Sequence, residues 1–151
     1  MNKTFFTKRG KDTKKECTLR MIYSGNNKYL LLLQAKRRID FKKFTIYHDK
    51  CAMKVGTDGV LLGAWTEVCP DSKYILDIGT GSGLIAIMLA QKCNAYIIGI
   101  DIDEEAVNQA TDNGKKTPWS QRLHFEVENA LTYIPQKKLD LITCNPPFVT
   151  N

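Results

Sequence analysis

Residues 74–83, which read YILDIGTGSG, contain the stretch that decides the fold. The first half, Tyr74–Ile78, is a short run of aromatic and aliphatic residues with one acid, which is typical of a buried strand. Three glycines follow at alternate positions: Gly79, Gly81 and Gly83. Because glycine lacks a Cβ, the backbone can turn sharply here and a ligand can approach it closely. The apolar stretch that follows predicts a helix over residues 84–92.

The alternation of strand and helix continues downstream. Residues 95–101 predict a second strand, and the acids at 103–105 supply an N-cap and a negative first turn for a helix that ends near residue 114. Further strands are predicted at residues 124–127 and 139–144. Strands that alternate with helices imply right-handed crossovers and a parallel sheet, so we expect an α/β fold.

Composition excludes several other classes of protein. The chain has 151 residues, of which 43% are hydrophobic and 25% charged, so it is neither disordered, collagen-like nor a coiled coil. Its longest aliphatic run, residues 30–33, is far shorter than the roughly 20 apolar residues of a membrane-spanning helix, and no secretory signal is found.

The five cysteines are scattered without a CxxC pair. We therefore expect reduced thiols in a cytoplasmic protein that binds neither membrane nor metal.

The formal charge of +6 is unevenly distributed. Residues 1–38 hold eleven of the 22 Lys and Arg residues but only two acids, so they carry +9 and the remainder carries −3. A basic segment on a slightly acidic body favours a polyanionic partner such as nucleic acid. The alternative is a solvated segment that recognises nothing. We therefore divide the chain into a basic N-terminal extension, residues 1–38, and a domain at residues 39–151.

The glycine turn and the acid after it suggest a nucleoside cofactor. Asp101 ends the second predicted strand, where a carboxylate can accept hydrogen bonds from both ribose hydroxyls. The glycine spacing is GxGxG rather than the GxGxxG that binds a dinucleotide pyrophosphate. Asp77 adds a carboxylate just upstream, which would repel phosphates but suit an amino group. These features favour S-adenosylmethionine over NAD.

The sequence NPPF at residues 145–148 predicts the chemistry. A conjugated amino nitrogen is a poor nucleophile because its lone pair is delocalised. The side-chain oxygen of Asn145 and the carbonyl of Pro146 can accept hydrogen bonds from its two protons and orient it, and such positioning can supply about 7–11 kcal/mol. Phe148 offers a flat face for a target base, with stacking worth about 1–3 kcal/mol. We predict these three residues to be catalytic; the alternative is a rigid turn that ends a strand.

Taken in order, DIGTGSG at 77–83, IDIDEEA at 100–106 and NPPF at 145–148 resemble the class I S-adenosylmethionine-dependent methyltransferases that modify amino nitrogens. The upstream segment HDKCAMKVGTDGVLLGAW, residues 48–65, is similar to the segment before the cofactor motif in bacterial tRNA1(Val) (adenine-37-N6)-methyltransferases. The resemblance implies a Rossmann-like fold, S-adenosyl-L-methionine as cofactor and tRNA as partner. The methyl acceptor would be N6 of adenine 37 in tRNA1(Val), stacked on Phe148 after leaving its neighbours.

The resemblance also places Thr57, Asp58 and Gly59 beside the cofactor. Where the family usually has an acid after the third strand to bind the cofactor's adenine, this chain has Asn129, whose oxygen could accept the same bond at a cost of about 1–2 kcal/mol. The expected cofactor-binding residues are therefore Thr57, Asp58, Gly59, Asp77, Gly79, Gly81, Gly83, Asp101 and Asn129.

The family's sheet has seven strands, and residues 41–148 resemble only its first part. We therefore expect an incomplete sheet of strands 1–4 of the seven, whose fourth strand is an exposed apolar edge. Residues 1–38 resemble nothing in the family. Such a fragment would bind the cofactor and be a poor catalyst by itself.

Two alternative functions differ in their substrates. Enzymes that methylate the glutamine side-chain amide (N5) in proteins also use NPPF-type turns, although the GTDG segment at 56–59 argues against them. A truncated, non-catalytic module could instead bind a cofactor or RNA. Methyl transfer separates an enzyme from such a module, whose binding to RNA would fall steeply with salt.

Overall fold

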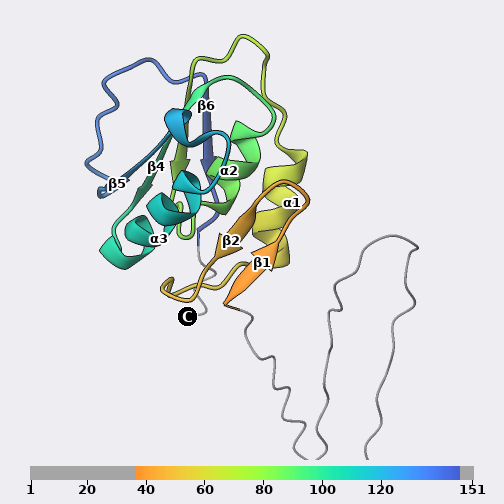
Figure 1. The fold of residues 1–151 in the computed structure, drawn as a ribbon. Helices are drawn as coiled ribbons and strands as arrows, with labels where there is room; N and C mark the ends of the chain where they lie inside the picture. Colours follow the sequence, from red (N-terminus) through yellow and green to blue (C-terminus); the bar gives the residue numbers. More distant parts are fainter. Residues whose placement is uncertain (1–36, 147–151) are drawn as a thin grey trace, which may run out of the picture. The chain divides into compact units, whose positions relative to one another are not determined.

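A computed structural model describes residues 37–146, which form a four-stranded sheet, three α-helices and a separate hairpin (Figure 1). The elements in chain order are β1 (Arg38–Asp40), β2 (Thr45–Tyr47), α1 (Thr57–Trp65), β3 (Tyr74–Ile78), α2 (Leu84–Ala90), β4 (Tyr96–Asp101), α3 (Glu104–Lys115), the 3-10 helix η1 (Ser120–Arg122), β5 (Leu123–Val127) and β6 (Leu141–Cys144). The predictions for residues 1–36 and for Phe148 lie outside the described residues.

The four-stranded sheet is parallel throughout, with the order β5-β4-β3-β6. The chain moves outward from β3 through β4 to β5, and β6 then returns to the other side of β3. Parallel α/β sheets bind their ligands at the carboxyl ends of the strands beside such a reversal. The glycine turn follows β3 and Asn145 follows β6, so the topology brings both predicted motifs to this point.

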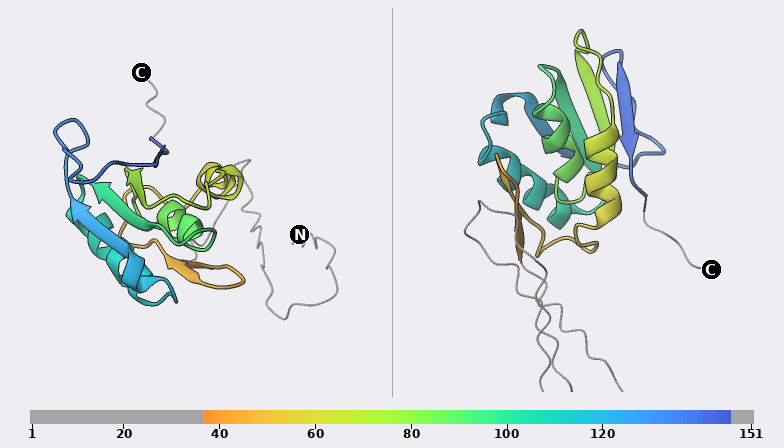
Figure 2. Two further views of the ribbon diagram at one scale, coloured as in Figure 1. Left: turned by 90° about the horizontal axis from the view of Figure 1, so that it is seen from above. Right: turned by 90° about the vertical axis from the view of Figure 1, so that its right-hand side faces the viewer.

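The three α-helices lie on one side of the sheet (Figure 2). Alternate strand residues face them: Ile75 and Ile97 are fully buried and pack with Ile85 and Leu89 of α2. The residues of opposite parity lie on the other side of the sheet, where no helix within residues 37–146 covers them. Ile142 of the edge strand β6 is 55% exposed there, which agrees with the expected apolar edge.

Most predicted elements are confirmed with small shifts at their ends. The strand expected at residues 74–78 is β3, and the helix expected from Leu84 ends at Ala90. Asp103 caps α3 as predicted, since its side chain accepts a hydrogen bond from the Glu105 amide at 2.9 Å. Within the described part of the chain, no helix is long and apolar enough to cross a membrane.

Helix α1 was not predicted. Its residues are apolar around most of the helix rather than on one stripe, so periodicity does not reveal it. Two small residues, Gly59 and Gly63, are its buried positions. A Cβ on Gly63 would lie 2.6 Å from the sulfur of Met88 in α2. A larger residue at this position would force Met88 to move, so glycine allows the close packing of α1 on α2. The start of α1 lies at the end of β6, where Asp58 and Asn145 are hydrogen-bonded.

One buried side chain joins the hairpin β1–β2 to the rest of the domain. Asn113 of α3 is fully buried, and its Oδ1 accepts a hydrogen bond from the Tyr47 amide at 3.0 Å. Its Nδ2 donates to the carbonyl oxygens of Tyr47, at 2.7 Å, and Ser82, at 2.9 Å. Asn113 thus links β2, the glycine turn and α3.

Candidate functional site

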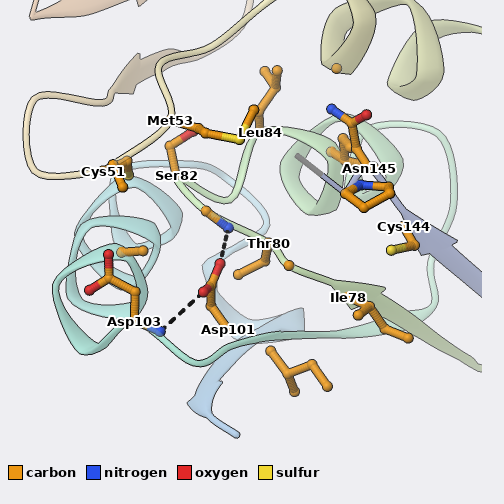
Figure 3. Close-up of a pocket in the computed structure, with 18 of the residues that line it drawn as sticks. Cys51, Met53, Ile78, Thr80, Ser82, Leu84, Asp101, Asp103, Cys144 and Asn145 are labelled. Atoms are coloured by element: carbon orange, nitrogen blue, oxygen red, sulfur yellow. Dashed lines mark hydrogen bonds between the residues drawn. The ribbon is translucent and has the colours of Figure 1, made fainter. Parts of the chain in front are cut away.

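A cavity of about 520 Å³ opens at the carboxyl ends of β3, β4 and β6 (Figure 3). Its walls come from the loop after β2, the start of α1, the glycine turn and the segments that follow β4, β5 and β6. The predicted site residues that line it are Asp58, Gly59, Gly79, Gly81, Asp101, Asn129, Asn145 and Pro146. Thr57, Asp77 and Gly83 do not line it.

The three glycines of the turn all have left-handed backbone conformations, with φ of +66°, +53° and +78°. Gly79 faces open space, since a Cβ there would meet no atom within 4 Å. Gly83 instead packs inward: a Cβ would lie 3.1 Å from both Ala110 and Phe125. The first two glycines therefore border the cavity, whereas the third allows α2 to pack closely against α3 and β5.

Asp77 does not present its carboxylate to the cavity, contrary to the interpretation from the sequence. Its side chain is fully buried and accepts hydrogen bonds from the hydroxyls of Thr80, at 2.8 Å, and Thr143, at 2.9 Å. The carboxylate thereby joins the glycine turn to β6. Burial raises the pKa of Asp77 from its ordinary 3.8 to about 6, although both hydroxyls oppose this shift.

The raised pKa of Asp77 predicts a pH-dependent stability. The folded protein binds the Asp77 proton more tightly than the unfolded chain does. The stabilisation of the folded state by protonated Asp77 is therefore fully present below about pH 4 and is lost as the pH rises through about 6. Asp77→Asn removes the titration and keeps the shape. We expect the free energy of unfolding of the variant, relative to wild type, to increase from pH 4 to pH 7 in urea titrations. A difference that does not change with pH would contradict this assignment.

Asp101 organises the other side of the cavity. Its Oδ2 accepts a hydrogen bond from the Gly81 amide at 2.8 Å, and its Oδ1 accepts one from the Asp103 amide at 3.1 Å (Figure 3). A carboxylate offers about four lone-pair sites, so it can accept further bonds from a ligand. Asp101 therefore lies where ribose hydroxyls can reach it and also holds the turn in place.

Asn145 lies across the cavity from Asp101 (Figure 3). Its Nδ2 donates a hydrogen bond to Oδ2 of Asp58, in the first turn of α1, at 3.1 Å. That bond and the Gly59 amide lower the pKa of Asp58. Because a carboxylate only accepts hydrogen bonds, it selects the amide orientation in which nitrogen faces Asp58 and oxygen points elsewhere. The carbonyl oxygen of Asn145 is thus the atom left for a ligand.

The loop between β2 and α1 forms the remaining wall, and the sequence did not identify its role in full. Lys54 Nζ donates to the carbonyl oxygens of His48, Asp49 and Cys51 at 3.0–3.1 Å. The Val55 amide donates to Nδ1 of His48 at 2.9 Å. These bonds close the loop and place Cys51 and its neighbours against the cavity. No local pattern marks Lys54 for this role, because its acceptors are backbone carbonyls.

The other predicted residues are placed as follows. Thr57 is the exposed first residue of α1 and is not among the residues that line the cavity. Asn129 borders the cavity beside Glu128, and its Oδ1 accepts a hydrogen bond from the Leu131 amide at 2.9 Å, which uses one of its two lone pairs. Among residues 37–146, no three His, Cys, Asp or Glu side chains gather as a metal site. The four cysteines in this range are free.

A match to a protein-family model shows the family to which the chain belongs. Residues 55–151 match the family model described as the methyltransferase small domain. The chain belongs to this family. The matched range contains α1, the glycine turn and the residues around Asn145, so the methyltransferase small domain holds most of the cavity described above.

Curated relatives confirm the resemblance seen in the sequence. The tRNA1(Val) (adenine(37)-N6)-methyltransferase of Phocaeicola vulgatus is 52% identical over 111 residues, which are 74% of this chain and 47% of that protein. The enzyme of the same name from Parabacteroides distasonis is 54% identical over 112 residues, 72% of this chain and 46% of that protein. The chain spans about half the length of the curated relatives that it matches.

A solved structure confirms the fold class. A SAM-dependent methyltransferase from Thiobacillus denitrificans, solved in complex with S-adenosyl-L-homocysteine, has a TM-score of 0.52 and 22% identity to this chain. The match covers 64% of this chain and 39% of that one. The four parallel strands of this methyltransferase small domain are therefore part of a Rossmann-like methyltransferase sheet.

Proposed function

We propose that the cavity binds S-adenosyl-L-methionine and that the protein transfers its methyl group to the N6 nitrogen of an adenine in tRNA. The name of the relatives, which specifies adenine 37 of tRNA1(Val), supports this substrate. The reaction would take place in the cytoplasm, where tRNA is found. We further propose that residues 1–38 form a basic extension to a partial methyltransferase domain at residues 39–151.

The residues of the cavity fit this cofactor. Its volume of about 520 Å³ lies within the range of small-molecule sites. The open backbone at Gly79 and Gly81 allows a ligand to approach closely, and Asp101 supplies a carboxylate for ribose hydroxyls. When bound, the cofactor supplies an electrophilic methyl group on a sulfonium ion.

The chain's own residues would orient the acceptor. The oxygen of Asn145 and the carbonyl of Pro146 would accept the two hydrogens of the adenine amino group and direct the nitrogen lone pair towards the methyl group. With the cofactor held by the glycine turn and Asp101, its methyl group would pass to N6, the electron pair of the S–C bond would stay on sulfur, and the displaced N6 proton would go to water. The single observation that supports this proposal is the hydrogen bond from Asn145 to Asp58, which occupies the amide nitrogen and leaves the amide oxygen as an acceptor for the amino group.

Cofactor binding can be tested apart from methyl transfer. We expect Asp101→Asn to raise the Kd for S-adenosylmethionine about 10- to 100-fold in equilibrium dialysis, because hydrogen bonds to a charged acceptor contribute about 1.5–3 kcal/mol. Glu104→Gln is the matched control, since this exposed residue loses the same charge but does not line the cavity. Equal effects of both substitutions, or no effect of either, would contradict the assignment.

Methyl transfer to unmodified tRNA1(Val) decides between the enzyme and its alternatives. Incorporation of labelled methyl into tRNA supports the proposal, and incorporation into a glutamine-containing protein instead would favour the glutamine enzyme. Cofactor binding without transfer to either substrate would indicate a non-catalytic module.

A further inference from the structure

The exposed positive charge of the described chain is concentrated on two neighbouring elements. Residues 37–47 and 109–116 contain six Lys and Arg side chains but only two acids, Asp40 and Asp112, so they carry +4. The rest of residues 37–146 carries −5. We call the six cations the hairpin–α3 surface; all are exposed, and they are Arg37, Arg38, Lys42, Lys43, Lys115 and Lys116.

Tyr47 holds cations from both elements around one ring. Nζ of Lys116, just after α3, lies 4.4 Å from the ring centroid, and the guanidinium carbon of Arg38 lies 6.0 Å from it. Arg38 Nη1 also donates to the Tyr47 hydroxyl at 3.3 Å. The backbone of Tyr47 is in turn fixed by Asn113. Two cations that are distant in sequence thus contact the same aromatic ring.

Other cations of the domain have structural roles instead. Lys54 closes the loop before α1, Lys92 Nζ donates to the carbonyls of residues 64 and 66, and Arg122 donates to those of residues 90 and 95. Within residues 37–146, the hairpin–α3 surface has one ion pair, between Arg38 and Asp40 at 3.6 Å. The other five cations form no ion pair with a described residue and are exposed, so they can meet a polyanion.

The surface is joined to the cavity by the loop that follows β2. Tyr47 ends β2, and this loop reaches the cavity at Cys51. Burial raises the pKa of the Cys51 thiol, and Asp101 and Asp103 lie close enough for their charges to help raise it, so this part of the rim is acidic and would repel phosphates. A nucleic acid whose base enters the cavity would therefore keep its backbone away from these acids, and it would find positive charge on the hairpin–α3 surface, where the same loop begins.

We propose that the hairpin–α3 surface binds the phosphate backbone of the RNA substrate and so orients the target base towards the cavity. The inference rests on the proposed function and names the surface that this function uses. Phosphate contacts of this kind position a nucleic acid without reading its sequence, so we expect weak discrimination among tRNAs at this surface.

Three pairs of adjacent lysines allow a matched test in the full chain. Lys42→Ala/Lys43→Ala and Lys115→Ala/Lys116→Ala alter the surface, while Lys137→Ala/Lys138→Ala removes the same charge from the exposed loop between β5 and β6. Filter binding to tRNA1(Val) is measured from 50 to 300 mM salt. Each surface variant should bind about tenfold more weakly. Its plot of log K against log salt concentration should have a slope smaller in magnitude by about 1.5, because each lost phosphate contact lowers that slope by roughly 0.7–0.9.

The controls separate the possible failures. Residues 1–36 are identical in all variants, so their contribution to tRNA binding cancels, and an unchanged Kd for S-adenosylmethionine shows that the cavity is intact. Equal weakening of tRNA binding by all three pairs would show a general effect of charge and would contradict the proposal that the hairpin–α3 surface binds tRNA. If the wild-type chain binds tRNA and no pair weakens that binding, the proposal for the surface is also wrong, but the proposed function stands. Failure of the wild-type chain to bind tRNA at all would count against the proposed function itself.

Discussion

Asn145→Ala is expected to lower methyl transfer to tRNA about 100- to 1000-fold while the Kd for S-adenosylmethionine changes by less than about threefold. The loss is of the size seen when one preorganised hydrogen bond to a reacting group is removed. The cofactor is retained because the substitution leaves the glycine turn and Asp101, across the cavity, untouched. Labelled methyl incorporation and equilibrium dialysis on the same preparation measure the two effects.

Asp58 provides the control for the role of Asn145. Asp58→Ala removes the acceptor that orients the amide, so kcat should fall by a smaller factor than in Asn145→Ala. Asp58→Asn retains an oxygen that can accept the same hydrogen bond and should recover most of the rate. If Asn145→Ala instead abolished cofactor binding and left the rate at saturating cofactor unchanged, the residue would be a cofactor ligand and the proposed orientation of the amino group would be wrong.

Asn113→Ala is expected to lower the free energy of unfolding by about 3–5 kcal/mol. The substitution leaves three backbone groups without their partner: the buried carbonyl of Ser82 and the part-buried amide and carbonyl of Tyr47. Each buried group without a partner costs about 1–3 kcal/mol. Urea unfolding followed by circular dichroism measures the change.

Asn108 is the matched control for Asn113, because it lies on the same helix but is exposed. Asn108→Ala should leave stability unchanged or raise it slightly, since alanine has the higher helix propensity. Asn113→Ala should also weaken binding of S-adenosylmethionine, because Ser82 belongs to the glycine turn. A loss of less than about 1 kcal/mol would mean that water replaces the amide and that the hairpin does not depend on Asn113.

The central strands and helices could be predicted because their signals are local. Tyr74–Ile78 is flanked by a glycine turn, and α3 begins at an acid that caps it, so a short window of sequence contains the cause of each element. Helix α1 lacks such a signal. Its position depends on the contact of Gly63 with Met88, which lies 25 residues further along the chain.

In the candidate site, too, some residues could be predicted from the sequence and others could not. Asn145, Asp101 and the first two glycines could be predicted because topology brings the ends of parallel strands together. The role of Asp77 could not be predicted, because nothing in the local sequence separates a buried structural carboxylate from one that faces a ligand. Only the packing shows that its carboxylate accepts hydrogen bonds from two threonine hydroxyls.

By itself, the sequence determined the parallel α/β fold, the edge of the sheet at which the ligand site forms and the chemical groups present there. These follow from hydrophobic periodicity, glycine turns and the order of strands, all of which act over short stretches of chain. Only the tertiary structure decided that Asp58 orients Asn145, that Asp77 is structural and that Tyr47 gathers cations from two elements. Such contacts join side chains far apart in sequence, and their geometry exists only once helices and sheet have packed.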